Sequence, residues 1–300
     1  MRKLLVAAIV AVAALSAASA RAVSTVASGA ASSNAASSTE ASCSKSSLQL
    51  VDAGTLTVGT DNPAYPPWYA GGSPKGSFWK INDPDNGKGF EPAVAYAVAA
   101  KLGFTRSQVK WAYVPFDKSF APGPKKFDFD INQISFTAAR AKVVTFSSSY
   151  YDVNQALVVL AGTKIASVHT LAGLKSFKLG AQLGTTSYSY ITSTIKPSQQ
   201  ASVFPQNAAA VQALKNKQID GLVVDLPTAF YVTAVQVPNS TILGQFPTET
   251  GGEHFGMVFA KGNSLAGCVN QALASLKSSG ELAKIQQQWL AKATGAPVLK

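Results

Sequence analysis

The sequence has little of the chemistry on which most enzymes depend. Its 300 residues include two histidines, His169 and His254, and two cysteines, Cys43 and Cys268, each far from its counterpart, so no pattern of zinc ligands is present. The signatures G-x-S-x-G, H-E-x-x-H, G-x-G-x-x-G and the phosphate-binding P-loop are missing as well. We therefore expect no metal, no cofactor and no catalysis. One alternative stays open, an enzyme in which Glu253 or His254 acts as acid or base.

Long apolar runs are also scarce. The one near the start, Leu4 to Leu15, is too short to span a bilayer. It follows Arg2 and Lys3 and precedes the small residues Ala18-Ser19-Ala20, which is the pattern of a secretory signal peptide. We predict that residues 1–20 are a signal peptide and that the protein is exported, to the periplasm or the exterior of the cell envelope.

Residues 21–47 consist mostly of alanine, serine and threonine, a composition that cannot bury a core and predicts a disordered spacer. An exported protein meets an oxidising compartment, so we expect Cys43 in this spacer to form a disulfide with Cys268. Such a bond would fasten the start of the fold to the C-terminal helices. Two free thiols, or a lipid anchor on Cys43, are the alternatives.

The charge balance is strongly basic, with a formal net charge of +11. The lysines are scattered along the chain, and no basic run with interleaved aromatic residues occurs. We therefore expect no nucleic-acid partner. An exported basic protein can instead lie close to an anionic envelope.

Alternating strand and helix patterns predict an α/β fold, and several predicted strands end in polar residues. Asp61 follows the strand at 56–60, and Asp225 follows the apolar strand at 222–224. Thr186 lies in a Gly-Thr-Thr-Ser turn before a helix. Open α/β sheets bind ligands at the carboxyl ends of their strands, so these positions predict a binding site. The proline- and aromatic-rich loop after Asp61 would flank it, unless that loop only covers the core.

The stretch from Phe127 to Tyr151 combines a strand, a hydroxyl-rich turn and an arginine. Residues 131–136 are predicted to form a strand, and Thr137 is placed to cap a helix that contains Arg140. A guanidinium at a helix N-terminus can hold a carboxylate. The alternative is an ordinary capped helix with a surface arginine.

Five motifs resemble a known family when taken in order. They are VGTDNPAYPPW, GFEPAVAYAVAAKLGF, FDFDINQISFTAARAKVVTFSSSYY, LGTTSYSY and IDGLVVDLPTAF. Together they resemble the bacterial extracellular solute-binding proteins of family 3, the receptors of amino-acid ABC importers, over about residues 48–290. The resemblance implies a two-lobed, periplasmic-binding-protein-like α/β fold with a two-strand hinge. Lobe 1 would comprise residues 48–156 plus 257–300, and lobe 2 residues 157–256, with crossing strands at 156–160 and 255–260.

The resemblance also implies how a ligand is held. In the family the arginine of T-x-x-R binds the α-carboxylate and an aspartate at the position of Asp225 binds the α-ammonium. Gln133 and Gln182 stand where other relatives carry different side chains and could add polar contacts. The implied ligand-binding residues are Asp61, Tyr65, Phe90, Gln133, Ser135, Thr137, Arg140, Gln182, Thr186 and Asp225.

The function implied is capture of an amino acid between two lobes and its delivery to the membrane permease of an ABC importer, by a protein that we expect to be a monomer. Two alternatives stay open at this point. One is a dehydratase-like enzyme on the same fold, and the other is a ligand-binding receptor for a sensor protein.

Overall fold

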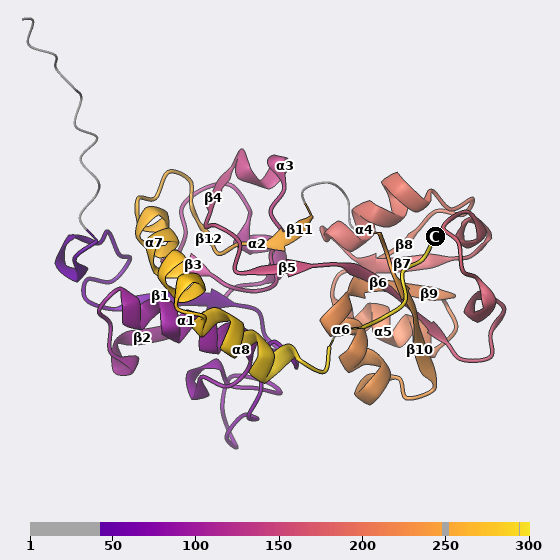
Figure 1. Ribbon diagram of the computed structural model, residues 1–300, viewed down its shortest axis with the longest axis horizontal. Coiled ribbons are helices and arrows are strands. Elements are labelled where there is room, and N and C mark those ends of the chain that lie inside the picture. Colours follow the sequence, from indigo (N-terminus) through magenta and orange to yellow (C-terminus); the bar gives the residue numbers. More distant parts are fainter. Residues whose placement is uncertain (1–42, 248–251, 294) are drawn as a thin grey trace, which may run out of the picture. The chain divides into compact units, whose positions relative to one another are not determined.

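The computed structural model describes residues 43–247, 252–293 and 295–300 (Figure 1). The predicted signal peptide and residues 21–42 of the predicted spacer lie outside the described residues. The last part of that spacer, residues 43–47, belongs to the folded body. The Lys45 ammonium there donates to the Gln108 side chain at 2.5 Å and lies over the Phe104 ring. The predicted spacer therefore extends too far, because a disulfide and these contacts hold its end on the fold.

The first lobe is built on a five-stranded sheet with the order β2-β1-β3-β12-β4. β1 is parallel to β2 and β3, whereas β12 runs antiparallel to β3 and β4. Its strands are β1 (Leu56–Thr60), β2 (Val109–Tyr113), β3 (Phe129–Asp130), β4 (Val144–Phe146) and β12 (Val258–Ala260). Its helices are α1 (Phe90–Lys101), α2 (Phe116–Ser119), α3 (Ala138–Ala141), α7 (Leu265–Ser278) and α8 (Glu281–Leu290).

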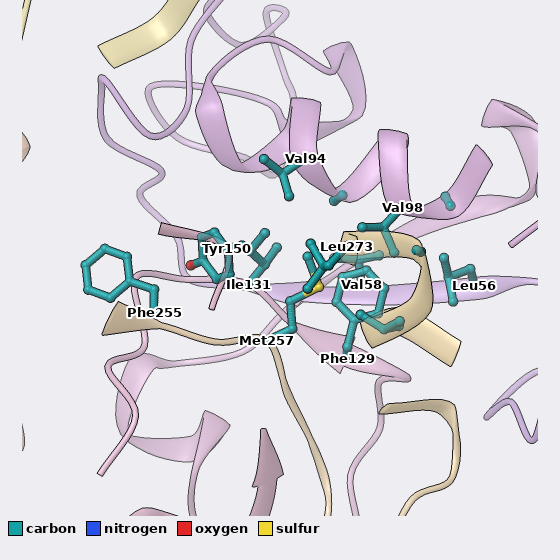
Figure 2. Packing of buried hydrophobic residues seen from close by; sticks show 14 of the residues in the cluster. Leu56, Val58, Val94, Val98, Phe129, Ile131, Tyr150, Phe255, Met257 and Leu273 are labelled. Carbon is teal, nitrogen blue, oxygen red and sulfur yellow. The ribbon is translucent and has the colours of Figure 1, made fainter. Parts of the chain in front are cut away.

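The core of this lobe lies between the sheet and the helices α1, α7 and α8. Figure 2 shows Val94 and Val98 reaching from α1 towards the sheet residues Val58 and Phe129, and all four are fully buried. The spacing of the two valines is that of one helix face. Gly103, with a φ of 82°, follows the end of α1 in the left-handed conformation, which glycine adopts readily.

The second lobe has its own five-stranded sheet, with the order β10-β6-β9-β7-β8. Its strands are β6 (Gln155–Leu160), β7 (Leu179–Gln182), β8 (Ser202–Phe204), β9 (Gly221–Asp225) and β10 (Ser240–Gln245). Its α-helices are α4 (Thr186–Tyr190), α5 (Asn207–Lys215) and α6 (Leu226–Tyr231). Buried side chains cover both faces of β6, which explains why this strand is apolar throughout.

Shorter helical turns complete the described residues. The 3-10 turns are η1 (Lys45–Ser47), η2 (Pro84–Asn86), η3 (Arg106–Gln108), η4 (Lys164–Ser167) and η5 (Ala172–Ser176). The π-helical turns η6 (Ile191–Ile195) and η7 (Val232–Gln236) continue α4 and α6. No helix in the described ranges is long and apolar enough to cross a membrane.

A separate two-stranded sheet pairs β5 (Tyr151–Val153) with β11 (Glu253–Phe255). In the chain, β5 connects β4 of the first sheet to β6 of the second, and β11 lies between β10 of the second sheet and β12 of the first. The two-lobed α/β fold with a two-strand hinge is therefore confirmed. The structure differs from the predicted crossing strands, because residues 156–160 pair within the second sheet and residues 258–260 within the first. The hinge strands are the neighbouring segments β5 and β11.

The C-terminal residues also depart from the predicted division of the chain. Residues 257–300 were all assigned to lobe 1, and α7 and α8 do pack there. After α8 the chain returns to the second lobe (Figure 1), where Val298 bridges Gln245 in parallel and Leu299 is buried in that lobe's core. The return is hard to foresee because the tail is too short to show a strand pattern.

The predicted disulfide is present. Cys43 and Cys268 are bonded with a Cα–Cα distance of 5.4 Å, across a sequence separation of 225 residues. The bond joins the first described residue to the buried face of α7. It fastens the start of the fold to a C-terminal helix, as expected from the export prediction.

Candidate functional site

Residues of both lobes line one cavity. The first lobe supplies the loop after β1, the start of α2 and the segment after β3. The second lobe supplies the ends of β7 and β9 and the first turns of α4 and α5. The lining residues are Asp61, Pro63, Ala64, Tyr65, Trp68, Tyr69, Phe116, Asn132, Gln133, Ser135, Gln182, Thr185, Thr186, Ser187, Gln206, Asn207, Ala208, Val223, Val224, Asp225 and Thr228. Asp61 and Asp225 are the charged residues among them.

Asp61 lies directly after β1, as the sequence predicted. Its carboxylate accepts a hydrogen bond from the Asn62 N–H at 2.7 Å. Burial raises the pKa of Asp61, although hydrogen bonds from the backbone of Asn62 and Phe116 act in the opposite direction. Tyr65 and Phe116 line the cavity on the same lobe. A carboxylate beside two aromatic rings is a favourable environment for a cation.

Asp225 ends β9 in the second lobe. Its carboxylate accepts a hydrogen bond of 2.6 Å from the side-chain amide of Gln155, and the Gln155 carbonyl in turn accepts from the Ser187 hydroxyl at 2.5 Å. Burial raises the pKa of Asp225, and the negative charge of Glu253 raises it further. A ligand ammonium would relieve both effects, because it supplies the missing positive charge.

Gln133 is held in an uncommon backbone conformation, with a φ of 49°. Its N–H donates to the Glu91 carboxylate at 2.7 Å, and its side-chain amide donates to the other oxygen of the same carboxylate. Glu91 is fully buried and also accepts from the Tyr150 hydroxyl at 2.6 Å. Burial raises the pKa of Glu91 to about 7 despite these hydrogen bonds. Glu91 therefore positions Gln133 at the cavity.

The predicted strand at 131–136 is absent for the same reason. The chain leaves the sheet after β3, and Ser135 makes only an isolated bridge, to Phe255 of β11. The hydrogen bonds between Gln133 and Glu91 replace the ladder that a strand would form. Thr137 does cap α3, because its hydroxyl accepts from the Arg140 N–H at 3.1 Å.

Arg140 does not line the cavity in this structure. Its guanidinium donates to the Ser135 carbonyl at 2.6 Å in the first lobe and to the Gly184 carbonyl at 2.7 Å in the second. The same group lies 4.1 Å from the centre of the Phe120 ring. Burial lowers the pKa of Arg140 to about 10, while the charges of Glu253 and Asp225 act in the opposite direction. Arg140 therefore links the two lobes through its hydrogen bonds to the Ser135 and Gly184 carbonyl groups.

Seven of the residues predicted to bind the ligand line the cavity, and three do not. Phe90, Thr137 and Arg140 are outside the lining; Phe90 is fully buried and packs edge-on against Trp68. The seven that line it are Asp61, Tyr65, Gln133, Ser135, Gln182, Thr186 and Asp225. The binding role of each of these residues stays a prediction.

Sequence reasoning missed several cavity residues. Phe116 begins α2, shortly after the end of β2, and its place between a predicted strand and the following segment could have identified it. Trp68 donates its indole N–H to the Thr228 hydroxyl of the other lobe at 3.0 Å, a contact that no sequence pattern announces. Asn207 has a buried side-chain oxygen with no hydrogen-bond partner in the described residues and lines the cavity.

The fold and the cavity together define a class of protein, a two-lobed binding protein that holds a small polar molecule between its lobes. Comparison with known families agrees. Residues 56–292 match the family model of the bacterial extracellular solute-binding proteins, family 3. This match covers most of the chain, and the protein belongs to that family.

Individual relatives support the same assignment. The chain is 30% identical over 217 residues to the ABC transporter glutamine-binding protein GlnH of Bacillus subtilis (strain 168), covering 70% of this chain and 76% of that protein. It is 27% identical over 255 residues to the L-cystine-binding protein TcyJ of Escherichia coli (strain K12), covering 83% and 86%. The structure of an ancestral arginine-binding protein bound to arginine matches with a TM-score of 0.64 and 31% identity, over 79% of this chain and 98% of that one.

These relatives are binding proteins, and this protein is a binding protein of the same amino-acid-binding family rather than an enzyme. The sequence had left Glu253 and His254 open as an acid or base. In the structure the Glu253 carboxylate is hydrogen-bonded by three side chains, and the His254 ring stacks on Phe136 at 5.4 Å.

Proposed function

We propose that this protein captures a basic amino acid between its lobes and delivers it to the membrane permease of an ABC importer. The observation that carries this proposal is the charge of the cavity. Its lining has a carboxylate from each lobe, Asp61 and Asp225, and among the described lining residues there is no lysine, arginine or histidine. A basic amino acid brings two cationic groups to these two carboxylates.

Each end of such a ligand has a suitable partner. Asp225 accepts the α-ammonium, a role implied by the family resemblance. Asp61, beside Tyr65 and Phe116, accepts the side-chain cation. Burial raises the pKa of both aspartates because it disfavours the charged carboxylate, and a ligand cation beside each one would stabilise the ionised form.

The experiment is calorimetric titration with L-arginine and L-citrulline, which have nearly the same shape but differ in side-chain charge. We expect arginine to bind much more tightly. Asp61→Asn should weaken arginine binding by about thirtyfold or more and leave citrulline binding nearly unchanged, because the loss of one partner of a buried charge pair costs at least about 2 kcal/mol. Asp225→Asn should weaken both ligands, because both carry the α-ammonium.

Equal affinity for arginine and citrulline would refute the basic-ligand proposal. In that case the next ligands to titrate are glutamine and cystine, because the relatives named above are glutamine- and cystine-binding proteins. Export and delivery are tested separately. N-terminal sequencing of the secreted protein locates the end of the signal peptide, and uptake of labelled arginine by cells with and without the protein tests transport.

A further inference from the structure

Glu253, at the start of the hinge strand β11, bridges hydroxyl groups of the two lobes. Its Oε1 accepts a hydrogen bond from the Ser135 hydroxyl of the first lobe at 2.5 Å. The same oxygen accepts from the Thr186 hydroxyl of the second lobe at 2.6 Å. Ser135 and Thr186 both line the cavity. Glu253 Oε1 therefore accepts one hydroxyl hydrogen bond from each lobe.

The other oxygen of this carboxylate faces the ammonium site. Glu253 Oε2 accepts a hydrogen bond of 3.0 Å from the Gln155 side-chain amide, and the same nitrogen donates to Asp225 at 2.6 Å. The Glu253 and Asp225 carboxylates thus share one donor. An amino acid bound with its ammonium at Asp225 would bring its own carboxylate into this neighbourhood.

We propose that Glu253 is an internal carboxylate that occupies the place of the ligand's α-carboxylate, so that an amino acid must displace it in order to bind. This inference rests on the proposed function, in which an amino-acid carboxylate binds at Ser135 and Thr186. Each of these hydroxyls has a single hydrogen to donate. While both hydrogens point at Glu253, neither is available to a second carboxylate, and two carboxylates at this separation also repel each other.

The displaced side chain has a polar region to enter. Glu253 already lines a second cavity, together with hydroxyl-bearing residues of α4 and η6, among them Ser189, Ser193 and Thr194, and with apolar residues such as Phe136 and Phe246. A rotated Glu253 carboxylate can remain solvated there. Displacement therefore exchanges one set of polar neighbours for another and does not leave an unpaired buried charge.

This arrangement makes Glu253 a determinant of specificity. A ligand with an α-carboxylate must break the hydrogen bonds of Glu253 with Ser135 and Thr186. A decarboxylated amine of the same shape leaves them in place. Glu253 thus weakens binding of the amino acid relative to its amine.

The test compares L-arginine with agmatine, which is arginine without its α-carboxylate, in the wild-type protein and in Glu253→Gln. A glutamine directs an amide nitrogen or a neutral oxygen at the same donors, and hydrogen bonds to a neutral acceptor are about half as strong as those to a carboxylate. We expect the ratio of the agmatine Kd to the arginine Kd to rise at least about tenfold in Glu253→Gln. Arginine carries a net charge of +1 and agmatine of +2, so the loss of the Glu253 charge by itself also raises this ratio. Repeating both titrations at high salt, which screens the long-range part of that effect, separates it from the competition for the two hydroxyls.

Asp152→Asn is the matched control. Asp152 lies on the partner strand β5, directly opposite His254, and is exposed. This substitution removes the same charge without touching the cavity, so the ratio should stay at its wild-type value. Glu253→Ala is a second variant for the case that the glutamine variant does not fold. An unchanged or lower ratio in a folded Glu253 variant overturns the proposal.

Failure of the proposed function gives a different result. If the wild type and the variant bind glutamine but not arginine, the basic-ligand proposal is wrong, and the same ratio is measured with glutamine and its decarboxylated amine. A Glu253 variant that binds an amino acid undetectable with the wild type supports the competition directly. If no amino acid binds to either protein, both proposals are overturned.

Discussion

The return of the C-terminal tail to the second lobe gives a quantitative prediction for Leu299. This side chain is 3% exposed and lies in the second-lobe core, close against β10. The approach needs a glycine at 244, because a Cβ there would lie 2.8 Å from Leu299 Cγ. Leu299→Ala removes a buried side chain at the edge of this core. We expect it to lower the free energy of unfolding by about 3 kcal/mol, within the usual range for such substitutions.

Backbone hydrogen bonds add to the side-chain contribution. The Gln245 N–H donates to the Pro297 carbonyl at 2.7 Å, and the Leu299 N–H donates to the Gln245 carbonyl at 2.9 Å. The Leu171 N–H donates to the Lys300 carbonyl at 2.8 Å. Each such bond contributes about 0.5–1.5 kcal/mol. Deletion of residues 296–300 should therefore destabilise the protein more than Leu299→Ala.

Urea unfolding followed by fluorescence measures these free energies, and hydrogen exchange of β10 locates the effect. Val298→Ala is the matched control, because this neighbouring side chain is 56% exposed and its loss should change stability by no more than about 0.5 kcal/mol. The reasoning would be refuted if the two alanine variants were equally stable. It would also be refuted if deletion of residues 296–300 left the exchange of β10 unchanged.

Two further predictions concern stability. Replacement of both Cys43 and Cys268 by serine should lower the free energy of unfolding by about 5 kcal/mol, since the two cysteines are 225 residues apart and the bond closes a long loop, and urea unfolding of the variant against the wild type measures the loss. Burial raises the pKa of Glu91 from 4.5 to about 7, so the folded state holds this proton more tightly than the unfolded state. Its contribution therefore favours folding below pH 4.5 and is lost as the pH rises to 7, by up to about 3 kcal/mol. Unfolding at pH 5 and pH 8 should show this slope, and Glu91→Gln should reduce it, although not to zero, because burial also raises the pKa of Asp61 and Asp225; an equal slope in both proteins would contradict the assignment.

Local features of this protein could be predicted from sequence because they depend on neighbours in the chain. Thr137 caps α3 through a contact within one helical turn. Asp61 and Asp225 follow apolar strands, and the strand pattern alone places them at the ends of β1 and β9. The order of five such motifs was sufficient for the family and the two-lobed fold.

The sequence was less informative where the chain leaves regular structure. The polar and apolar residues at 131–136 fit a strand, yet Gln133 adopts a left-handed conformation there. The competing interaction is the buried carboxylate of Glu91, 42 residues earlier in the chain. Likewise, the pattern at 156–160 predicted a strand correctly but could not tell to which sheet the strand belongs.

The sequence by itself determined many of the elements, though not the conformation of residues 131–136, and it determined the disulfide partners and the acidic residues at the strand ends, because these follow from local pattern or from composition. Only the tertiary structure decided what surrounds the ligand position. It brings Glu253 from the hinge to Ser135 and Thr186, 118 and 67 residues away, and it turns Arg140 towards carbonyl groups of both lobes. These contacts form when two lobes close on one cavity, and no spacing within the chain encodes that closure.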